Sequence, residues 1–218
     1  MDPSPIATLP LPQRLALSYA PRRSREAVLT LLLLDNRLAD ILRRANEPLI
    51  AQMKLAWWRD RLAQDMADWP EGEPLLERLR RWPGAVVDLG PLVDGWERLL
   101  ADDLTMSAVE RYAQGRGQAW EALAQSLGDG DGVRMVGAAA RQWALADLAL
   151  HLGKDAERRI ARQAALRARG GNRRLPRSMR TLAILRALTN RALDRDTPEL
   201  LDGPRAAMLA LRIGLTGR

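Results

Sequence analysis

Residues 25–45, REAVLTLLLLDNRLADILRRA, form a long run of helix-favouring residues with helix signals on both sides. Ser24 precedes the run as a candidate N-cap, because a serine hydroxyl can accept a hydrogen bond from a free N–H of the first turn. Asn46 and Pro48 follow as a break and a restart, since Asn favours the cap position and Pro is tolerated in the first turn. This stretch therefore predicts one helix over 25–45 and a second over about 48–68.

The rest of the chain has the same helix-forming composition. It is rich in Ala, Leu and Arg, and Gly or Pro interrupts it at short intervals, which is typical of helices joined by short loops. Ser107 with Glu110 predicts a capping box, and Thr197 with Pro198 predicts the start of the last helix. We predict an all-α bundle of about eight helices, with a single domain over 1–218 and residues 1–12 as a flexible leader.

Composition excludes some chemistry and bounds the location. The chain has no Cys, which excludes disulfides, thiolate metal sites and a cysteine nucleophile. The longest apolar run, 28–34, is far too short to span a bilayer, and residues 1–12 lack the features of a signal peptide. We therefore expect a soluble cytoplasmic protein, with peripheral contact at the inner membrane as an extension of that expectation.

Positive charge is concentrated in the last third of the chain. The net charge is +7, and residues 156–218 contain fifteen Arg against five acidic residues. Such a surface suits diphosphate, anionic lipid or nucleic acid, because each presents dense negative charge. Solvated arginine faces are an equally good interpretation, and no recognition helix, zinc spacing or stacking motif favours nucleic acid.

Five motifs taken together are similar to a known family. They are LLLLDNRLADI at 31–41, Glu47-Pro48, MKLAWWRD at 53–60, WALADL at 143–148 and GNRRLP at 171–176. The pattern resembles the squalene/phytoene synthase family over roughly residues 14–195. The resemblance implies an all-α isoprenoid-synthase fold with a central cavity. For intact members it also implies head-to-head coupling of two prenyl diphosphates with the help of Mg²⁺.

Two aspartate pairs of that family are altered in this chain. The resemblance implies a pair on each of two facing helices, spaced four residues apart so that both carboxylates share one face. At the first pair Asp40 would be matched by position 44, which is Arg44, and Asp35 lies about 140° around a helix from Asp40. At the second, aspartates are expected near 151 and 155, where the chain has His151 and Asp155. We expect the clamp for a leaving diphosphate to be incomplete on both sides.

The second helix nevertheless offers a candidate metal site. Asp147, His151 and Asp155 repeat every four residues, so they would form one stripe if the helix continued unbroken past Gly153. A histidine with carboxylates favours Zn²⁺, Mn²⁺ or Fe²⁺. The alternative is a histidine at the rim of the core, with Asp147 bonded to a neighbouring arginine.

Two pairs of neighbouring residues are further candidates. Arg173 and Arg174 are interpreted either as diphosphate contacts or as solvated side chains of a glycine-rich loop. Trp57 and Trp58 point about 100° apart on a helix, so at most one could line a cavity, and core packing is the favoured interpretation.

The favoured functional hypothesis is a non-catalytic family member that binds a protein partner. Glu47-Pro48 and the LAWWRD motif at 55–60 resemble the branch of the family that contains a respiratory complex I assembly factor, which implies an assembly-type role without a cofactor. The alternative is a Mg²⁺-dependent prenyl diphosphate transferase, with a prenyl diphosphate or related lipid as its ligand. In that case the metal would be recruited in an unusual geometry by Asp35, Asp40, Asp147 and Asp155.

Overall fold

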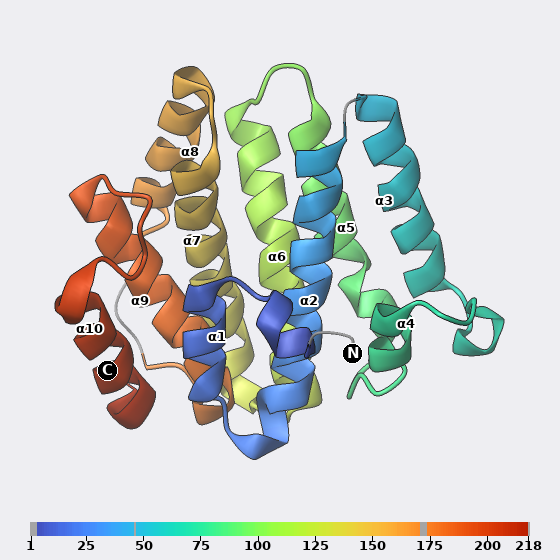
Figure 1. The fold of residues 1–218 in the computed structure, drawn as a ribbon, viewed down its shortest axis with the longest axis horizontal. Helices are drawn as coiled ribbons and strands as arrows, with labels where there is room; N and C mark the ends of the chain where they lie inside the picture. Colours follow the sequence, from blue (N-terminus) through green and yellow to red (C-terminus); the bar gives the residue numbers. More distant parts are fainter. Residues whose placement is uncertain (1–3, 46, 171–173, 218) are drawn as a thin grey trace.

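The computed structural model describes residues 4–45, 47–170 and 174–217, and every regular element in these ranges is a helix (Figure 1). This confirms the predicted all-α class. None of the described helices is long and apolar enough to cross a bilayer. The α-helices are α1 (Leu11–Ser18), α2 (Arg22–Arg44), α3 (Pro48–Ala63), α4 (Pro74–Leu79), α5 (Gly90–Glu97), α6 (Met106–Ser126), α7 (Val133–His151), α8 (Asp155–Arg167), α9 (Arg180–Arg195) and α10 (Gly203–Thr216).

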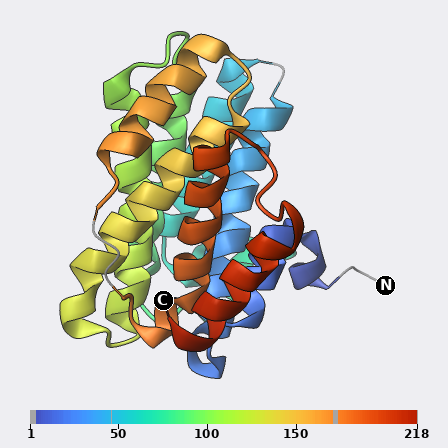
Figure 2. The same ribbon diagram turned by 90° about the vertical axis from the view of Figure 1, so that its left-hand side faces the viewer.

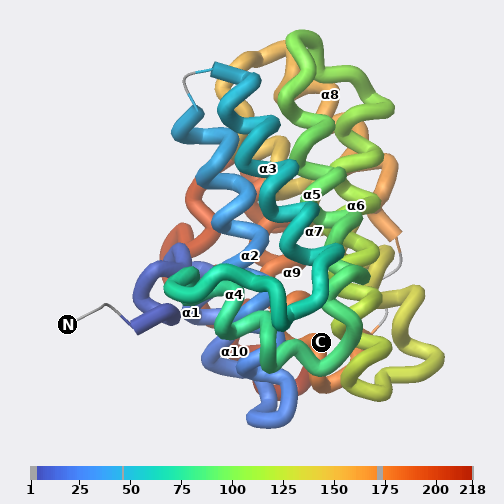
Figure 3. The backbone as a smooth tube through the Cα atoms, turned by 90° about the vertical axis from the view of Figure 1, so that its right-hand side faces the viewer, coloured from blue at the N-terminus to red at the C-terminus, as the bar shows by residue number. Residues whose placement is uncertain are grey.

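The long helices lie side by side around α6 and α7. Helix α6 packs against α5 and α7, α7 packs against α9, and α9 in turn contacts α1 and α10. Figure 2 shows α10 crossing in front of α9, and Figure 3 shows α3 and α5 side by side at the opposite side of the bundle.

The bundle has two ends that carry different connections. The α2–α3, α5–α6 and α7–α8 connections lie at the end drawn uppermost in Figure 1. We call it the motif end, because α2 and α7 reach it directly after the altered aspartate motifs. The α1–α2 and α6–α7 connections and the start of α9 lie at the other end, which we call the basal end.

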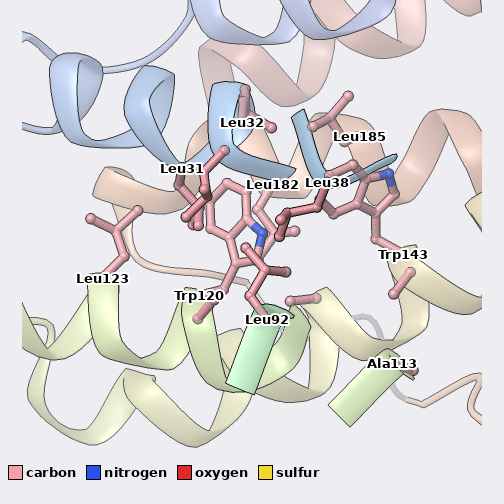
Figure 4. Close-up of a cluster of buried hydrophobic side chains, with 14 of the residues drawn as sticks. Leu31, Leu32, Leu38, Leu92, Ala113, Trp120, Leu123, Trp143, Leu182 and Leu185 are labelled. Carbon is pink, nitrogen blue, oxygen red and sulfur yellow. The ribbon is translucent and has the colours of Figure 1, made fainter. Parts of the chain in front are cut away.

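Tryptophan and leucine side chains fill the interior between α2, α6, α7 and α9. Trp120 and Trp143 are buried and meet edge to face, with ring centroids 6.0 Å apart. Figure 4 shows these rings surrounded by leucines from α2 and α9, among them Leu31, Leu38 and Leu182. The chain has no Phe, so the indole rings supply most of the aromatic bulk. Side chains therefore occupy the space at this level of the bundle, where the resemblance implied a central cavity.

Two helices begin upstream of the predicted caps. Helix α2 starts directly after Pro21, whose extended backbone fixes the entry of the chain, and Ser24 lies inside the helix, where its hydroxyl donates to the Pro21 carbonyl oxygen at 3.3 Å. Helix α6 is capped by Thr105, whose hydroxyl oxygen accepts the N–H of Ala108 at 3.2 Å. The predicted Ser107 cap is wrong because Thr105 offers the same chemistry two residues earlier.

The two chain ends also differ from expectation. Helix α10 begins at Gly203 rather than at Thr197, whose hydroxyl instead accepts the N–H of Glu199 in a local turn. Near the N-terminus, residues expected in a flexible leader form regular structure, with a 3₁₀ helix at Pro5–Thr8 and a buried Leu9. Residues 1–3 lie outside the described part of the chain.

The helix does not continue past Gly153, so the condition for the Asp147, His151 and Asp155 stripe is not met. Helix α7 ends at His151, Leu152 is extended with φ −71° and ψ 134°, and α8 begins afresh at Asp155. The glycine is an accurate signal of the break, because it disfavours helix continuation. The residues of the predicted metal stripe are therefore divided between two helices.

Candidate functional site

Arg116 of α6 lies in the interior and joins the two helices that carry the altered aspartate motifs. Its side chain is 3% exposed. Its Nε lies 3.0 Å from Oδ2 of Asp35 on α2, and its Nη2 also donates to that oxygen. Its Nη1 donates to Oδ2 of Asp147 on α7 at 3.1 Å and to the Tyr112 hydroxyl oxygen at 2.8 Å. One guanidinium group thus bridges Asp35 and Asp147, one carboxylate from each of the two motif helices.

Asp35 has no open coordination face. Its second carboxylate oxygen, Oδ1, accepts the indole N–H of Trp96 at 2.8 Å, and the side chain is buried. Burial raises the pKa of Asp35, while the charge and hydrogen bonds of Arg116 oppose that rise. Burial lowers the pKa of Arg116, but Asp35, Tyr112 and Asp147 more than offset this and raise it above its ordinary value. The guanidinium group is therefore a permanent internal cation.

Aromatic rings enclose this cation. The guanidinium carbon of Arg116 lies 4.1 Å from the ring centroid of Trp143, 5.6 Å from that of Tyr112 and 5.8 Å from that of Trp96. Such cation–π contacts are worth about 2 kcal/mol or more when water is excluded. Burial raises the pKa of the Tyr112 hydroxyl, so this neighbour is neutral near pH 7.

The remaining predicted site residues lie at the surface of the motif end. Asp40 forms an ion pair with Arg43 one turn along α2, and Arg44 is exposed in the last turn. His151 Nδ1 lies 2.7 Å from the Asp147 carbonyl oxygen, so the histidine contacts its own helix. Asp155 is exposed and pairs with Arg158 at 3.2 Å. Within the described ranges no three His, Cys, Asp or Glu residues gather as a metal would require.

Comparison with known proteins agrees with the motifs and the fold. Residues 14–160, more than half of the chain, match the squalene/phytoene synthase family. The chain belongs to the squalene/phytoene synthase family. No curated protein and no solved structure matches the sequence. The match shows the family, while the assembly-factor branch stays a prediction.

The residues of this family member do not fit the Mg²⁺ clamps that the family implies. A clamp needs two carboxylates with free oxygens on one helix face. On α2, Asp35 is buried against Arg116 and Asp40 is matched by Arg44. On α7, Asp147 is paired with Arg116 and is followed one turn later by His151. Neither helix presents a free pair, so we derive no metal-dependent step.

One of the two predicted diphosphate contacts, Arg174, does not join this centre. Arg173 lies outside the described residues. Arg174 is exposed at the basal end, beside the start of α7. Asp147 lies fourteen residues beyond Val133 on α7, which corresponds to roughly 21 Å along the helix axis. Arg174 and the motif residues therefore belong to different ends of the family fold.

Sequence reasoning missed Arg116, although the sequence carries a signal for it. Tyr112 and Arg116 are spaced four residues apart within a stretch of small residues, Ala113, Gly115 and Gly117. A charged residue on the small, buried face of a helix requires a partner. Searching the facing helices for acidic residues that lacked a partner would have suggested Asp35 and Asp147.

Proposed function

We propose that this squalene/phytoene synthase family member is non-catalytic and acts as a partner-binding, assembly-type factor. The observation that carries the proposal is the Arg116 bridge between Asp35 and Asp147. Asp35 and Asp147, two of the carboxylates that the prenyl transferase alternative would need to recruit Mg²⁺, neutralise a protein cation instead.

Recruiting a divalent ion to this centre would be costly. The ion would have to replace Arg116 as the partner of Asp35, and this would remove the buried one of the two carboxylates that neutralise the guanidinium group. An unpaired buried charge costs several kcal/mol. A diphosphate at the motif end would also lack metal ions to neutralise it, because Asp40 already pairs with Arg43 on the surface. These energetics favour a structural role for the centre.

An exposed apolar face on α3 supports a partner-binding role. Leu49, Met53 and Trp57 follow one another at intervals of four residues and are 64%, 66% and 37% exposed. The adjacent Trp58 packs into the core, as expected for one of two neighbouring indoles. An exposed stripe of large apolar side chains is typical of a protein-binding surface. We infer that the partner is a subunit of a respiratory complex, met at the cytoplasmic side of the inner membrane, and this inference rests on the family resemblance.

A turnover assay tests the catalytic part of the proposal. The protein is incubated with farnesyl or geranylgeranyl diphosphate and Mg²⁺, and diphosphate release and prenyl products are measured. We expect no Mg²⁺-dependent release above the enzyme-free rate, because no aspartate pair is free to hold the metal. An active phytoene synthase assayed in parallel is the positive control. Coupled product together with diphosphate would establish the prenyltransferase alternative and overturn the proposal.

A surface variant tests the partner-binding part. Leu49→Ser combined with Met53→Ser should change the free energy of unfolding by no more than about 0.5 kcal/mol per site, because both side chains are exposed. Proteins cross-linked to the wild-type chain in the membrane fraction should be lost from this variant. The control is Leu11→Ser with Leu166→Ser, which removes exposed apolar groups from α1 and α8. Identical cross-linked sets for the α3 variant and the wild type would refute a binding role for this face.

A further inference from the structure

A pocket at the basal end gathers arginine side chains that the motif centre does not use. It has a volume of about 440 Å³ and lies between the start of α7 and the segment that leads into α9. It is lined by Asp129, Gly132, Met135, Arg174, Leu175, Pro176, Arg177 and Arg180. Three guanidinium groups therefore face one carboxylate.

The single carboxylate of the pocket is already engaged. Asp129 accepts a hydrogen bond from the Ser178 hydroxyl, and its other oxygen lies 3.9 Å from Nη2 of Arg23 on α2. It is therefore shared with a further arginine from outside the pocket. Positive charge in the pocket exceeds negative charge.

The arginines of the pocket lie close together. Gly217 has a φ of 85°, and a Cβ atom at that position would lie 2.1 Å from Nη1 of Arg180 and 2.9 Å from Nε of Arg174. The two guanidinium groups thus converge on one point. Arg180 is 7% exposed and donates to the Ile213 carbonyl oxygen at 3.0 Å, while Arg174 and Arg177 have no hydrogen bond or ion pair to a described residue.

The electrostatic environment of the pocket is strongly positive, as its three arginines suggest. Burial, and then the positive charges of Arg174 and Arg177, lower the pKa of Arg180. The N-terminal ends of α7 and α9, both long helices, border the same space and add the positive ends of their dipoles. A group with two or more negative charges would relieve this repulsion, and planar guanidinium groups match the oxygens of a phosphate.

We propose that the basal pocket is a binding site for a phosphate group, held by Arg174, Arg177 and Arg180. The site lies at the opposite end of the bundle from the altered aspartate motifs and needs no metal ion. It is therefore independent of whether the family member is catalytic. The phosphate can belong to a free phosphorylated compound or to the headgroup of an anionic phospholipid.

Helix α10 is the reason to distinguish a phospholipid headgroup from a free phosphorylated compound. Met208, Leu211 and Leu215 are exposed on this helix, and its C-terminal end borders the pocket at Gly217. Apolar side chains beside basic ones are typical of a surface that rests on an anionic bilayer.

The test uses the variant Arg174→Gln/Arg177→Gln, which removes two charges and keeps the buried Arg180. Binding of inorganic phosphate and pyrophosphate, without Mg²⁺, is measured by calorimetry, and binding to vesicles is measured by flotation. The vesicles contain phosphatidylcholine alone or with phosphatidylglycerol. The control variant Arg159→Gln/Arg167→Gln removes two exposed charges from α8.

We expect the pocket variant to bind at least roughly tenfold more weakly than the wild type, because two charge-assisted contacts are lost. The control variant should bind as the wild type does. Without ligand, the pocket variant should be no less stable than the wild type, because the substitutions relieve repulsion at Arg180 rather than break an ion pair. Loss of phosphate and pyrophosphate binding supports a free phosphate source, and loss confined to phosphatidylglycerol vesicles supports a lipid source.

Two results would overturn the site. One is binding that is absent for every probe, and the other is binding that the control variant loses as much as the pocket variant. Because the assay contains neither Mg²⁺ nor a prenyl group, its outcome is separate from that of the turnover assay.

Discussion

Replacing Arg116 by methionine is expected to lower the free energy of unfolding by about 3–5 kcal/mol. The substitution keeps a long apolar stem and removes the charge that Asp35 and Asp147 share. Asp35 is then a buried carboxylate that keeps, among the described residues, the hydrogen bond from Trp96 alone. Denaturant unfolding followed by tryptophan fluorescence measures the loss. A domain with a typical stability of about 5–15 kcal/mol would keep its fold with a reduced margin.

Two companion variants make this prediction specific. Arg111→Met, an exposed change on the same helix, should shift stability by less than about 0.5 kcal/mol. Adding Asp35→Asn to Arg116→Met should restore part of the loss, because the unpaired charge is gone while an acceptor for Trp96 stays. A free energy of unfolding for Arg116→Met within about 1 kcal/mol of the wild-type value would contradict the prediction, because single substitutions commonly have effects of that size. The bridge would then not stabilise the centre.

The loss should also depend on pH. Without Arg116, the main cause that opposes the burial-raised pKa of Asp35 is absent, so the pKa in the folded variant rises further. The folded variant then binds a proton at pH values where the unfolded chain, with an aspartate pKa of about 3.9, has already released it. Its stability falls as pH rises through the folded pKa. The difference between the variant and the wild type should be smallest near pH 4–5 and largest near pH 8, as measured by unfolding in matched buffers.

Replacing Gly115 by alanine is expected to be the second most damaging change. A Cβ at this position of α6 would lie 2.1 Å from the carbonyl oxygen of Pro91 and 3.2 Å from the Cα of Gly95, both backbone atoms of α5. Rigid backbone cannot yield as a side chain can, so the two helices must separate. We expect a loss of about 3 kcal/mol or more and a melting temperature lowered by roughly 5–10 °C.

A glycine on the neighbouring helix supplies the control for this prediction. Gly90 begins α5 with φ −51°, and a Cβ there meets nothing within 4 Å. Gly90→Ala should therefore be neutral or stabilising by about 0.4–1 kcal/mol, because alanine reduces the freedom of the unfolded chain. Equal melting temperatures for Gly115→Ala and the wild type would show that α5 and α6 do not approach as closely as the structure has them.

The helices could be predicted from sequence because local signals specify them. The run 25–45 has strong helix formers, and Pro and Gly punctuate the chain where connections occur. The first residue of each helix is harder to predict, because several neighbouring residues can occupy the N-cap position. Thr105 and Ser107 carry similar oxygens, and the local sequence does not decide between them.

The sequence signals a buried cation at Arg116, but it does not specify the pairing of the centre, because this joins residues that are distant in sequence. Arg116 and Asp35 are 81 residues apart, and their contact follows from the packing of α6 against α2 and α7. Motif comparison directed attention to the acidic positions 35, 40, 147 and 155, of which 35 and 147 contact the internal cation. It gave no reason to consider a cation on a third helix.

The arrangement around Arg116 also bears on how readily substitutions could build two complete aspartate pairs into this chain. Arg44→Asp and His151→Asp would rebuild the four-residue spacing on α2 and α7, yet Asp147 would still be held by the guanidinium group. If Arg116 is replaced first, the fold loses the stability described above. If it is replaced last, the two earlier substitutions do not yet improve metal binding. Each single substitution toward two complete aspartate pairs is therefore either without effect on metal binding or harmful to stability, so the internal cation opposes the stepwise construction of a metal site.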